Sequence, residues 1–206
     1  MKTTIVEIFV ARHGQNEDNL NGILNGHRDL PLTDLGRQQA HNLGEGILNS
    51  SIVFDAIYSS PLIRALETAR IVSKIVGLPS PVLLPNLIER DFGIMTGRKI
   101  DEIEEMCAPD ILKIETMTYF ISPKGSESFP ELITRAQKVL DEVRAKHSSG
   151  KVLLVCHGDI GKMLYAAATG KDWKLVLQDF HMGNGDLIDL SGNGEAHVIK
   201  LEQFNS

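Results

Sequence analysis

"TIVEIFVARHG", residues 4–14, joins a nearly unbroken run of apolar and β-branched residues to an arginine, a histidine and a glycine. Such a run predicts a strand covered on both faces, because a strand with one solvent-exposed face would alternate apolar and polar positions. Arg12 and His13 are costly to bury without partners, so their place at the strand's end needs a reason. Ligands of parallel sheets bind beyond the carboxyl ends of the strands, and we therefore expect a site at this tip.

The segments that follow alternate between strand and helix patterns. Strand–helix alternation with continuous apolar strands predicts an α/β fold of three layers, with a mostly parallel central sheet between two layers of helices. The pattern ends in a predicted hairpin of residues 186–190 and 196–202. Further strands are expected at 54–60, 82–87 and 151–156, and helices at 31–48, 60–77, 98–106, 129–143 and 157–170.

Local signals indicate where some of these elements begin and where the pattern weakens. Thr33 is the expected N-cap of the first helix. Ser60 is the expected N-cap of the second, with Pro61 at its first position. Residues 107–125 show the least regular pattern, and we interpret them as part of a cap or lid.

Length and composition limit the class of protein. One domain accommodates the 206 residues, of which 42% are hydrophobic and 23% charged. The formal net charge of −6 argues against a nucleic-acid or membrane-surface binder, which would carry a basic surface. Cys107 and Cys156 lack metal-type spacing and suit a reduced compartment. Glu7 interrupts the first apolar run, which makes a poor signal peptide, so we expect a cytoplasmic protein without a membrane span.

Chemistry-bearing residues recur at the ends of the predicted strands. The first strand ends in Arg12-His13-Gly14 and a late strand ends in His157-Gly158. Arg64 lies in the first turn of the helix that follows the second strand, and Glu89 comes just after the third. The carboxyl ends of parallel strands share one edge, so these side chains are expected to meet there.

These residue types suit phosphoryl transfer. A dianionic phosphate needs several fixed positive donors, which arginines and helix N-termini supply. A neutral imidazole is a competent nucleophile toward phosphorus. A carboxylic acid whose pKa is raised by a secluded site can protonate the leaving oxygen. This chemistry needs neither a metal nor a cofactor, and its expected partner is a small phosphorylated substrate.

Six segments of the chain occur in the order and approximate spacing of a known family. They are "ARHGQNEDN" (11–19), "DLPLTDLGRQQA" (29–40), "SSPLIRALETA" (59–69), "IERDFG" (88–93), "GSESFPELITR" (125–135) and "CHGD" (156–159). Together they resemble the histidine phosphatase superfamily, also called phosphoglycerate-mutase-like proteins. The resemblance covers nearly the whole chain and implies a three-layer α/β/α fold, with an inserted cap that residues 94–128 fit. We expect one such domain over residues 1–206.

The resemblance also implies roles for individual residues. His13 matches the histidine that becomes phosphorylated, and Glu89 matches the proton donor to the leaving group, which then activates water. Arg12, Arg64 and His157 match the groups that surround the phosphate. Asn19 matches an asparagine near the phosphate pocket.

The chain departs from the family pattern in two places. The family often has threonine where this chain has Asn16. Many of its phosphatases have Trp-Glu-Gly after the "FG" pair, where this chain has Met95-Thr96-Gly97. The second difference lies in the expected cap segment, so no substrate can be carried over from a particular subfamily.

Plainer interpretations stand beside the functional ones. Arg12 and His13 could form a structural pair at a strand end, and Arg64 could be a solvated residue, because it falls off the apolar stripe of its helix. Glu89 could belong to a surface charge cluster with its acidic and basic neighbours. The loop before the last hairpin makes Asn184 a candidate for substrate contact. The sequence leaves the roles of three residues open, namely His27, Arg28 and His181.

Three functions compete. The favoured one is a metal-independent phosphatase that acts on small phosphate monoesters through a phosphohistidine on His13. The second is a phosphoglycerate mutase that uses the same intermediate; this chain is shorter than the family's usual mutases, and its cap stretch differs from theirs. The third, a non-catalytic phosphate-binding module, conflicts with the complete set of expected catalytic residues. The sequence leaves the oligomeric state open, with a homodimer as one alternative.

Overall fold

The computed structural model describes residues 6–115, 117–191 and 197–199, with the side chains of residues 197 and 198 left aside. Thr4 and Ile5, where the first strand was expected to begin, lie outside this part. So does the turn expected in the final hairpin. Within the described part, no helix is long and apolar enough to cross a membrane.

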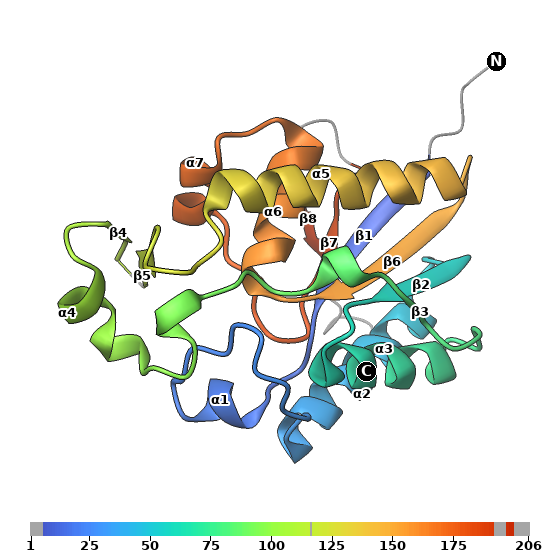
Figure 1. Cartoon of the computed structure of the whole chain (residues 1–206). Coiled ribbons are helices and arrows are strands. Elements are labelled where there is room, and N and C mark those ends of the chain that lie inside the picture. Colours follow the sequence, from blue (N-terminus) through green and yellow to red (C-terminus); the bar gives the residue numbers. More distant parts are fainter. Residues whose placement is uncertain (1–5, 116, 192–196, 200–206) are drawn as a thin grey trace.

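A central sheet of six described strands organises the fold, in the order β3-β2-β6-β1-β7-β8 (Figure 1). The first four run parallel to one another, whereas β7 is antiparallel to β1 and to β8. The prediction of a mostly parallel sheet is therefore confirmed. The strand bounds are β1 Glu7–Arg12, β2 Ala56–Ser59, β3 Val82–Leu83, β6 Lys151–Cys156, β7 Leu187–Asp189 and β8 His197–Ile199.

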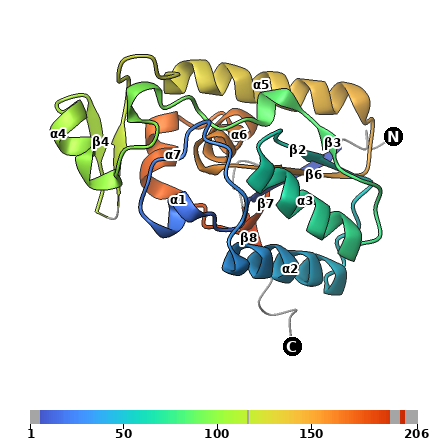
Figure 2. The same cartoon turned by 60° about the horizontal axis from the view of Figure 1, so that its bottom comes forward.

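Helices cover both faces of this sheet, as the continuous apolar strands predicted. One face carries α5 (Phe129–Lys146), α6 (Gly158–Thr169) and α7 (Trp173–Asp179), and the other carries α2 (Asp34–Asn49) and α3 (Ile63–Ile75) (Figures 1 and 2). Successive residues of a strand point to opposite faces. Val10 accordingly packs in the core beneath α5 and α6, and its neighbour Ala11 packs in the core beneath α2 and α3.

Of the two helix starts predicted from a cap residue, one agrees with the structure and the other differs. Thr33 caps α2 by accepting a hydrogen bond from the Gly36 amide, as predicted. The expected cap at Ser60 is wrong, because α3 begins at Ile63 with Leu62 as its N-cap. Ser60 Oγ instead receives the Leu62 amide and contacts the His157 ring, so the turn before α3 is used by the site.

Two predicted elements are shorter or more broken than expected. The strand expected at 82–87 ends at Leu83, and the 3-10 turn Pro85–Leu87 follows it. The polar helix expected at 98–106 divides into a 3-10 turn, Ile100–Glu102, and α4, Ile103–Cys107.

The cap segment, residues 94–128, lies beyond one end of the sheet (Figures 1 and 2). Its stretch 107–125 is more regular than expected, since β4 (Ile111–Lys113) pairs antiparallel with β5 (Thr118–Phe120). Backbone hydrogen bonds between Leu24 and the pair Gly97 and Arg98 tie the cap segment to the loop after α1 (Glu17–Leu20). A separate small core supports this region: Phe92, Met95, Ile103, Cys107 and Phe120.

Candidate active site

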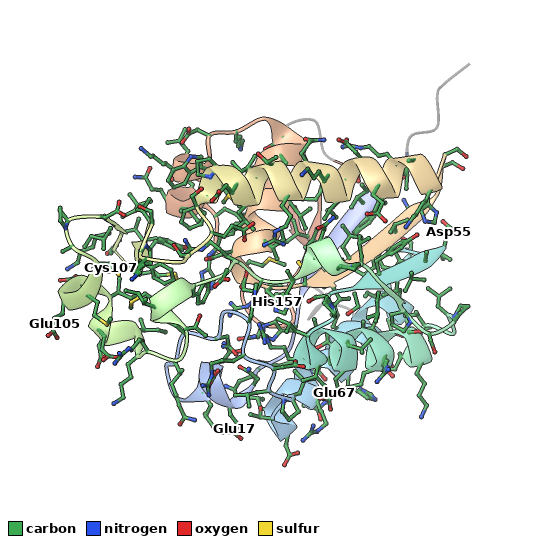
Figure 3. All side chains as sticks on the ribbon, viewed as in Figure 1. Glu17, Asp55, Glu67, Glu105, Cys107 and His157 are labelled. Carbon is green, nitrogen blue, oxygen red and sulfur yellow. The ribbon has the colours of Figure 1, made fainter. Side chains whose placement is uncertain are left out.

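The carboxyl ends of the strands open onto a cavity of about 290 Å³. Four of the residues predicted from the strand ends line it: Arg12, His13, Arg64 and Glu89. The fifth, His157, packs against His13 with 5.0 Å between the ring centroids. His157 marks this place near the middle of the molecule in Figure 3, well away from Cys107 in the cap segment and from Asp55 at the far end of the sheet. We call these five residues the phosphate end of the cavity.

The tautomer of His13 follows from its neighbours. Its Nδ1 lies 2.6 Å from the Gly14 carbonyl oxygen, which can only accept, so Nδ1 carries the proton. Nε2 is then unprotonated, and its lone pair accepts a hydrogen bond from Arg64 Nε at 3.2 Å. Burial, followed by the charges of Arg64 and Arg12, keeps the pKa of His13 well below its usual value. His13 is therefore a neutral imidazole with its nucleophilic nitrogen beside the guanidinium of Arg64.

The loop that carries His13 is held by backbone contact with α2. A Cβ on Gly14 would lie 2.2 Å from the Gly36 carbonyl oxygen, and one on Gly36 would lie 2.0 Å from the Gln15 carbonyl oxygen. No side chain fits at either position without moving the backbone. The Gly14 amide also donates to Thr68 Oγ1 on α3, at 3.1 Å. Two helices of one layer thus fix the nucleophile.

Arg64 is fully buried rather than solvated, which overturns the plainer interpretation of this residue. Its guanidinium donates to the carbonyl oxygens of Arg28, at 2.6 Å, and Gly26, at 3.0 Å, besides His13. Burial lowers the pKa of Arg64 to about 10, which leaves it protonated at neutral pH. Arg64 therefore brings a fixed positive charge to the cavity and at the same time holds the 26–28 loop in place.

Arg12 and His157 each keep a buried nitrogen without a hydrogen-bond partner among the described groups of the protein. These atoms are Arg12 Nε and His157 Nδ1. The remainder of each side chain is anchored, since Arg12 Nη1 donates to the Met182 carbonyl and His157 Nε2 lies 2.7 Å from Ser60 Oγ. Buried polar atoms are rarely left unpaired without a functional reason. Two of them at one site, beside the buried guanidinium of Arg64, fit an anionic ligand.

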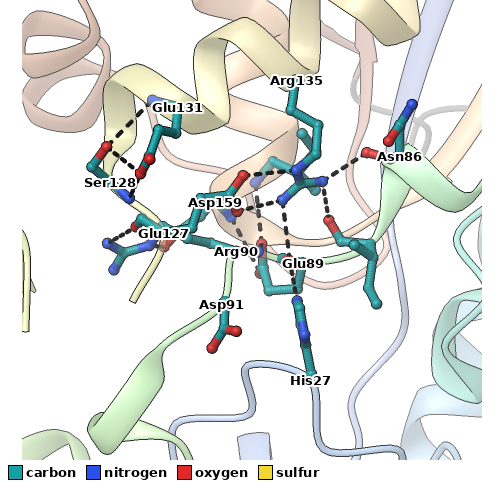
Figure 4. Close-up of polar contacts among 12 residues, drawn as sticks. His27, Asn86, Glu89, Arg90, Asp91, Glu127, Ser128, Glu131, Arg135 and Asp159 are labelled. Carbon is teal, nitrogen blue, oxygen red and sulfur yellow. Dashed lines mark hydrogen bonds and ion pairs between the residues drawn. The ribbon is translucent and has the colours of Figure 1, made fainter. Parts of the chain in front are cut away.

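The carboxylate of Glu89 packs against the N-terminus of α6, and the residue is buried, with 6% of its surface exposed. Its carboxylate accepts hydrogen bonds from the Arg90 amide at 2.9 Å and from the Asp159 and Ile160 amides at 3.3 and 3.1 Å (Figure 4). Burial, and next the charge of Asp159, raises the pKa of Glu89 despite these donors and the nearby Arg64. A carboxyl group with a raised pKa beside a neutral histidine has the properties of a general acid.

The backbone of Glu89 is clamped from two sides. Arg135 on α5 donates to the carbonyl oxygens of Asn86, Ile88 and Glu89, at 2.7, 2.6 and 3.2 Å. His27 Nε2 approaches the Glu89 carbonyl oxygen at 2.7 Å from the opposite direction, as Figure 4 shows. Glu127 in turn pairs with Arg135 at 2.7 Å. The position of the Glu89 carboxyl group therefore depends on side chains that do not line the cavity.

The remaining predicted residues divide between the cavity wall and its support. Asn19 lines the cavity. Asn184 does not; its amide donates to the His13 carbonyl at 2.8 Å and to Asn19 Oδ1 at 3.3 Å. Arg28 pairs with Asp18 at 2.7 Å, and His181 lines a different cavity. These contacts assign Asn184 and Arg28 to the framework of the site.

The cavity can hold a small anion beside Arg64. His13 offers a nucleophilic nitrogen to that anion, and Glu89 can supply a proton. Within the described ranges, no three histidine, cysteine, aspartate or glutamate side chains gather as metal ligands. The histidine phosphatase superfamily (branch 1) matches residues 8–204 of the chain.

The chain belongs to the histidine phosphatase superfamily. A relative from Rhizobium etli, named 2,3-bisphosphoglycerate-dependent phosphoglycerate mutase, is 34% identical over 176 residues, which cover 84% of this chain and 82% of that protein. A relative from Arabidopsis thaliana, named metal-independent phosphoserine phosphatase, is 29% identical over 98% of this chain and 87% of its own. The structure of phosphoserine phosphatase from Entamoeba histolytica in complex with 3-phosphoglyceric acid matches 90% of each chain, with a TM-score of 0.74 and 25% identity.

Members of this superfamily are phosphatases or mutases, and the names of the relatives include both. The alignment with the Rhizobium protein covers nearly equal shares of the two chains, so they are of similar length. The shorter length that the sequence analysis set against a mutase therefore carries no weight for this relative. Chain length does not separate the two activities here.

The sequence missed the residues that join the phosphate end to the cap segment. Arg90 is 1% exposed, pairs with Asp159 at 2.9 Å and lies over the rings of Phe120 and Phe129. The plainer interpretation of Glu89 and its charged neighbours as a surface cluster is thus wrong for Glu89 and for Arg90, since both are buried. Lys162 was missed too, although a lysine inside the apolar helix run "GDIGKMLY" was a visible signal.

Proposed function

We propose that this protein is a metal-independent phosphomonoester hydrolase that acts in the cytoplasm on a small phosphorylated metabolite, through a phosphohistidine on His13. The observation that carries the proposal is the neutral His13, whose proton is fixed on Nδ1 and whose Nε2 lies beside Arg64 in the cavity. A nucleophile needs an unprotonated lone pair, and the Nδ1 tautomer leaves one on Nε2. Arg64 Nε donates to this lone pair, so that hydrogen bond must pass to a phosphate oxygen before Nε2 attacks.

In the first step, His13 Nε2 attacks phosphorus, and the bond from phosphorus to the ester oxygen breaks. Glu89 gives its proton to that oxygen, so the alcohol leaves neutral. Arg12, Arg64 and the unpaired Nδ1 of His157 surround the phosphoryl oxygens and stabilise the charge that they carry in the transition state. In the second step, the Glu89 carboxylate takes a proton from water. The water oxygen attacks phosphorus, the P–N bond breaks, and His13 is restored as phosphate leaves.

The mutase alternative has one specific observation in its favour, the 34% identity to a protein named as a mutase. A phosphoglycerate mutase must bind a small and densely charged substrate at both of its ends. The cavity beyond the phosphate end is instead lined mainly by apolar side chains from the loop at residues 23–24 and from the cap segment, such as Ile23, Ile100, Ile103 and Met117. This lining supports the phosphatase. We propose that the cap segment selects the alcohol part of the substrate.

The test is phosphate release in EDTA from p-nitrophenyl phosphate, phosphoglycerates, phosphoserine, sugar phosphates and nucleotides. We expect the wild type to release phosphate, and His13→Ala to lose at least about 10⁴-fold in kcat/KM while circular dichroism shows it folded. Wild type quenched in alkaline denaturant should carry an alkali-stable, acid-labile phosphate on the peptide that contains His13. Equal hydrolysis by His13→Ala would refute the mechanism, and isomerisation of phosphoglycerates without phosphate release would establish the mutase.

A further inference from the structure

Lys162 is a buried cation in the wall of the cavity. It lies on α6, four residues after Gly158, the first residue of that helix. Only 4% of its surface is exposed. Gly158 and Lys162 both line the cavity, since residues four apart share one face of a helix. The two positions are separated by roughly 6 Å along the helix axis.

The charge of Lys162 has no acidic partner in the part of the chain that the structure describes. Its ammonium group donates to the Tyr119 hydroxyl at 3.0 Å and lies 4.9 Å from the centre of that ring. Asp159, the acid nearest along the helix, is taken up by an ion pair with Arg90 at 2.9 Å. An ammonium group has three N–H donors, and a buried charge without a counter-ion is costly. The contact with Tyr119 supplies no negative charge to balance the ammonium group.

Arg90, the other cation in this part of the wall, already has an acidic partner and hydrogen-bond acceptors for its guanidinium. Besides Asp159 it donates to the Phe120 carbonyl at 3.2 Å, and its guanidinium lies 4.2 Å from the centre of the Phe129 ring. An incoming anion would have to break these contacts to reach Arg90. Lys162 is therefore the cation in this wall that gains most from a ligand's negative charge.

Apolar side chains make up much of the cavity lining outside the phosphate end. We call these side chains the cap wall: Ile23, Leu24, Phe92, Ile100, Ile103, Met117 and Phe120. Polar residues also line this part of the cavity, among them Asn25, Thr118 and Asp159. Where the middle section of a substrate packs against the cap wall we expect it to be apolar, because a polar group there would lose its hydration without gaining partners from these side chains.

We propose that Lys162 binds a carboxylate of the substrate, so that the enzyme takes phosphomonoesters whose alcohol part carries a carboxylate beyond an apolar segment. This inference rests on the proposed phosphatase function. It differs from a substrate such as phosphoserine or phosphoglycerate, in which the carboxylate lies close to the phosphate and the carbons between them carry polar groups. Lys162 and the cap wall together set the distance and the polarity of the linker.

The experiment compares 4-carboxyphenyl phosphate with 4-carbamoylphenyl phosphate. The second ester has the same shape, but an uncharged amide replaces its carboxylate. For wild type, we expect kcat/KM to be roughly 10- to 100-fold higher for the carboxylate ester, the size of a hydrogen bond to a charged group. The 2-carboxyphenyl isomer should lose this preference. Lys162→Met should lower the carboxylate-to-amide ratio to about one, whereas Lys138→Met, an exposed lysine on α5, should keep the wild-type ratio.

Two further variants separate binding from a merely structural role. If Lys162 only anchored Tyr119, then Tyr119→Phe would lower the ratio as Lys162→Met does. We expect Tyr119→Phe to keep the preference for the carboxylate, and Lys162→Arg to keep most of it. A wild-type ratio near one, or an unchanged ratio in Lys162→Met, would overturn the inference. Absence of any His13-dependent phosphate release from either ester would instead refute the proposed function.

Discussion

The phosphate end and the cap wall are built in different ways. The phosphate end consists of charged and polar side chains whose other atoms are anchored, as in the three hydrogen bonds of Arg64 and the backbone clamp on Glu89. The cap wall consists of apolar side chains from four separate segments, and Lys162, which lines the same cavity, has no acidic partner within the described residues. The difference indicates that the chemistry is fixed by hydrogen bonds at the strand ends, whereas specificity depends on packing.

Among the variants that test the contrast between the phosphate end and the cap wall, Glu89→Gln is expected to lower activity most. The variant removes the acid without changing the shape, and we expect kcat for an alkyl phosphate to fall by about 10²- to 10⁴-fold. Hydrolysis of p-nitrophenyl phosphate should fall far less, because its leaving oxygen needs little protonation. An equal loss on both esters would show that Glu89 acts by positioning rather than as an acid.

The same residue sets the alkaline limit of activity. Burial raises the pKa of Glu89 and lowers that of His13, so the active form, with Glu89 protonated and His13 neutral, exists between the two values. Activity on alkyl phosphates should therefore decline as pH rises through the raised pKa of Glu89. It should also decline as pH falls through the lowered pKa of His13. A pH–rate profile of Glu89→Gln should lack the alkaline decline.

Arg135→Met has an intermediate effect and tests whether the anchoring matters. The variant removes one donor from each of three carbonyl oxygens of the 86–89 turn, and we expect about a tenfold loss of kcat with little change in KM. The loss should be larger for alkyl than for nitrophenyl esters, as for Glu89→Gln. Arg144→Met on the same helix is the control, since that side chain is 43% exposed. Equal kinetics of the two variants would show that the clamp is dispensable.

Ile103→Ala tests the cap wall and has the smallest effect on catalysis. Ile103 is 2% exposed and packs in the small core of the cap segment, so we expect a loss of about 2–4 kcal/mol in the free energy of unfolding. KM should change by a few-fold and by different amounts for different esters, while kcat changes less. A uniform loss of kcat across all esters would mean that the two regions are coupled more tightly than their structures suggest. Urea unfolding and a panel of aryl esters measure the two effects.

The sequence predicted the phosphate end better than the cap wall for a physical reason. Arg12, His13 and His157 adjoin strands whose apolar runs are unmistakable, so their meeting follows from the parallel sheet. Arg64 is buried although it lies off the apolar stripe of α3, because backbone carbonyls rather than apolar neighbours receive it. The cap wall joins Phe92 with residues 23–24, 100–103 and 117–120, whose proximity depends on 3-10 turns and a short hairpin that no periodicity indicates.

The backbone contact between Gly14 and Gly36 has a consequence for inhibitor design. Neither residue has a side chain that could rotate away, so a bound molecule cannot enlarge this side of the phosphate end by induced fit. Compounds that differ only in their phosphate mimic should therefore discriminate poorly among members of the superfamily that share this loop. Selectivity for this protein is to be sought in substituents that extend along the cap wall toward Lys162.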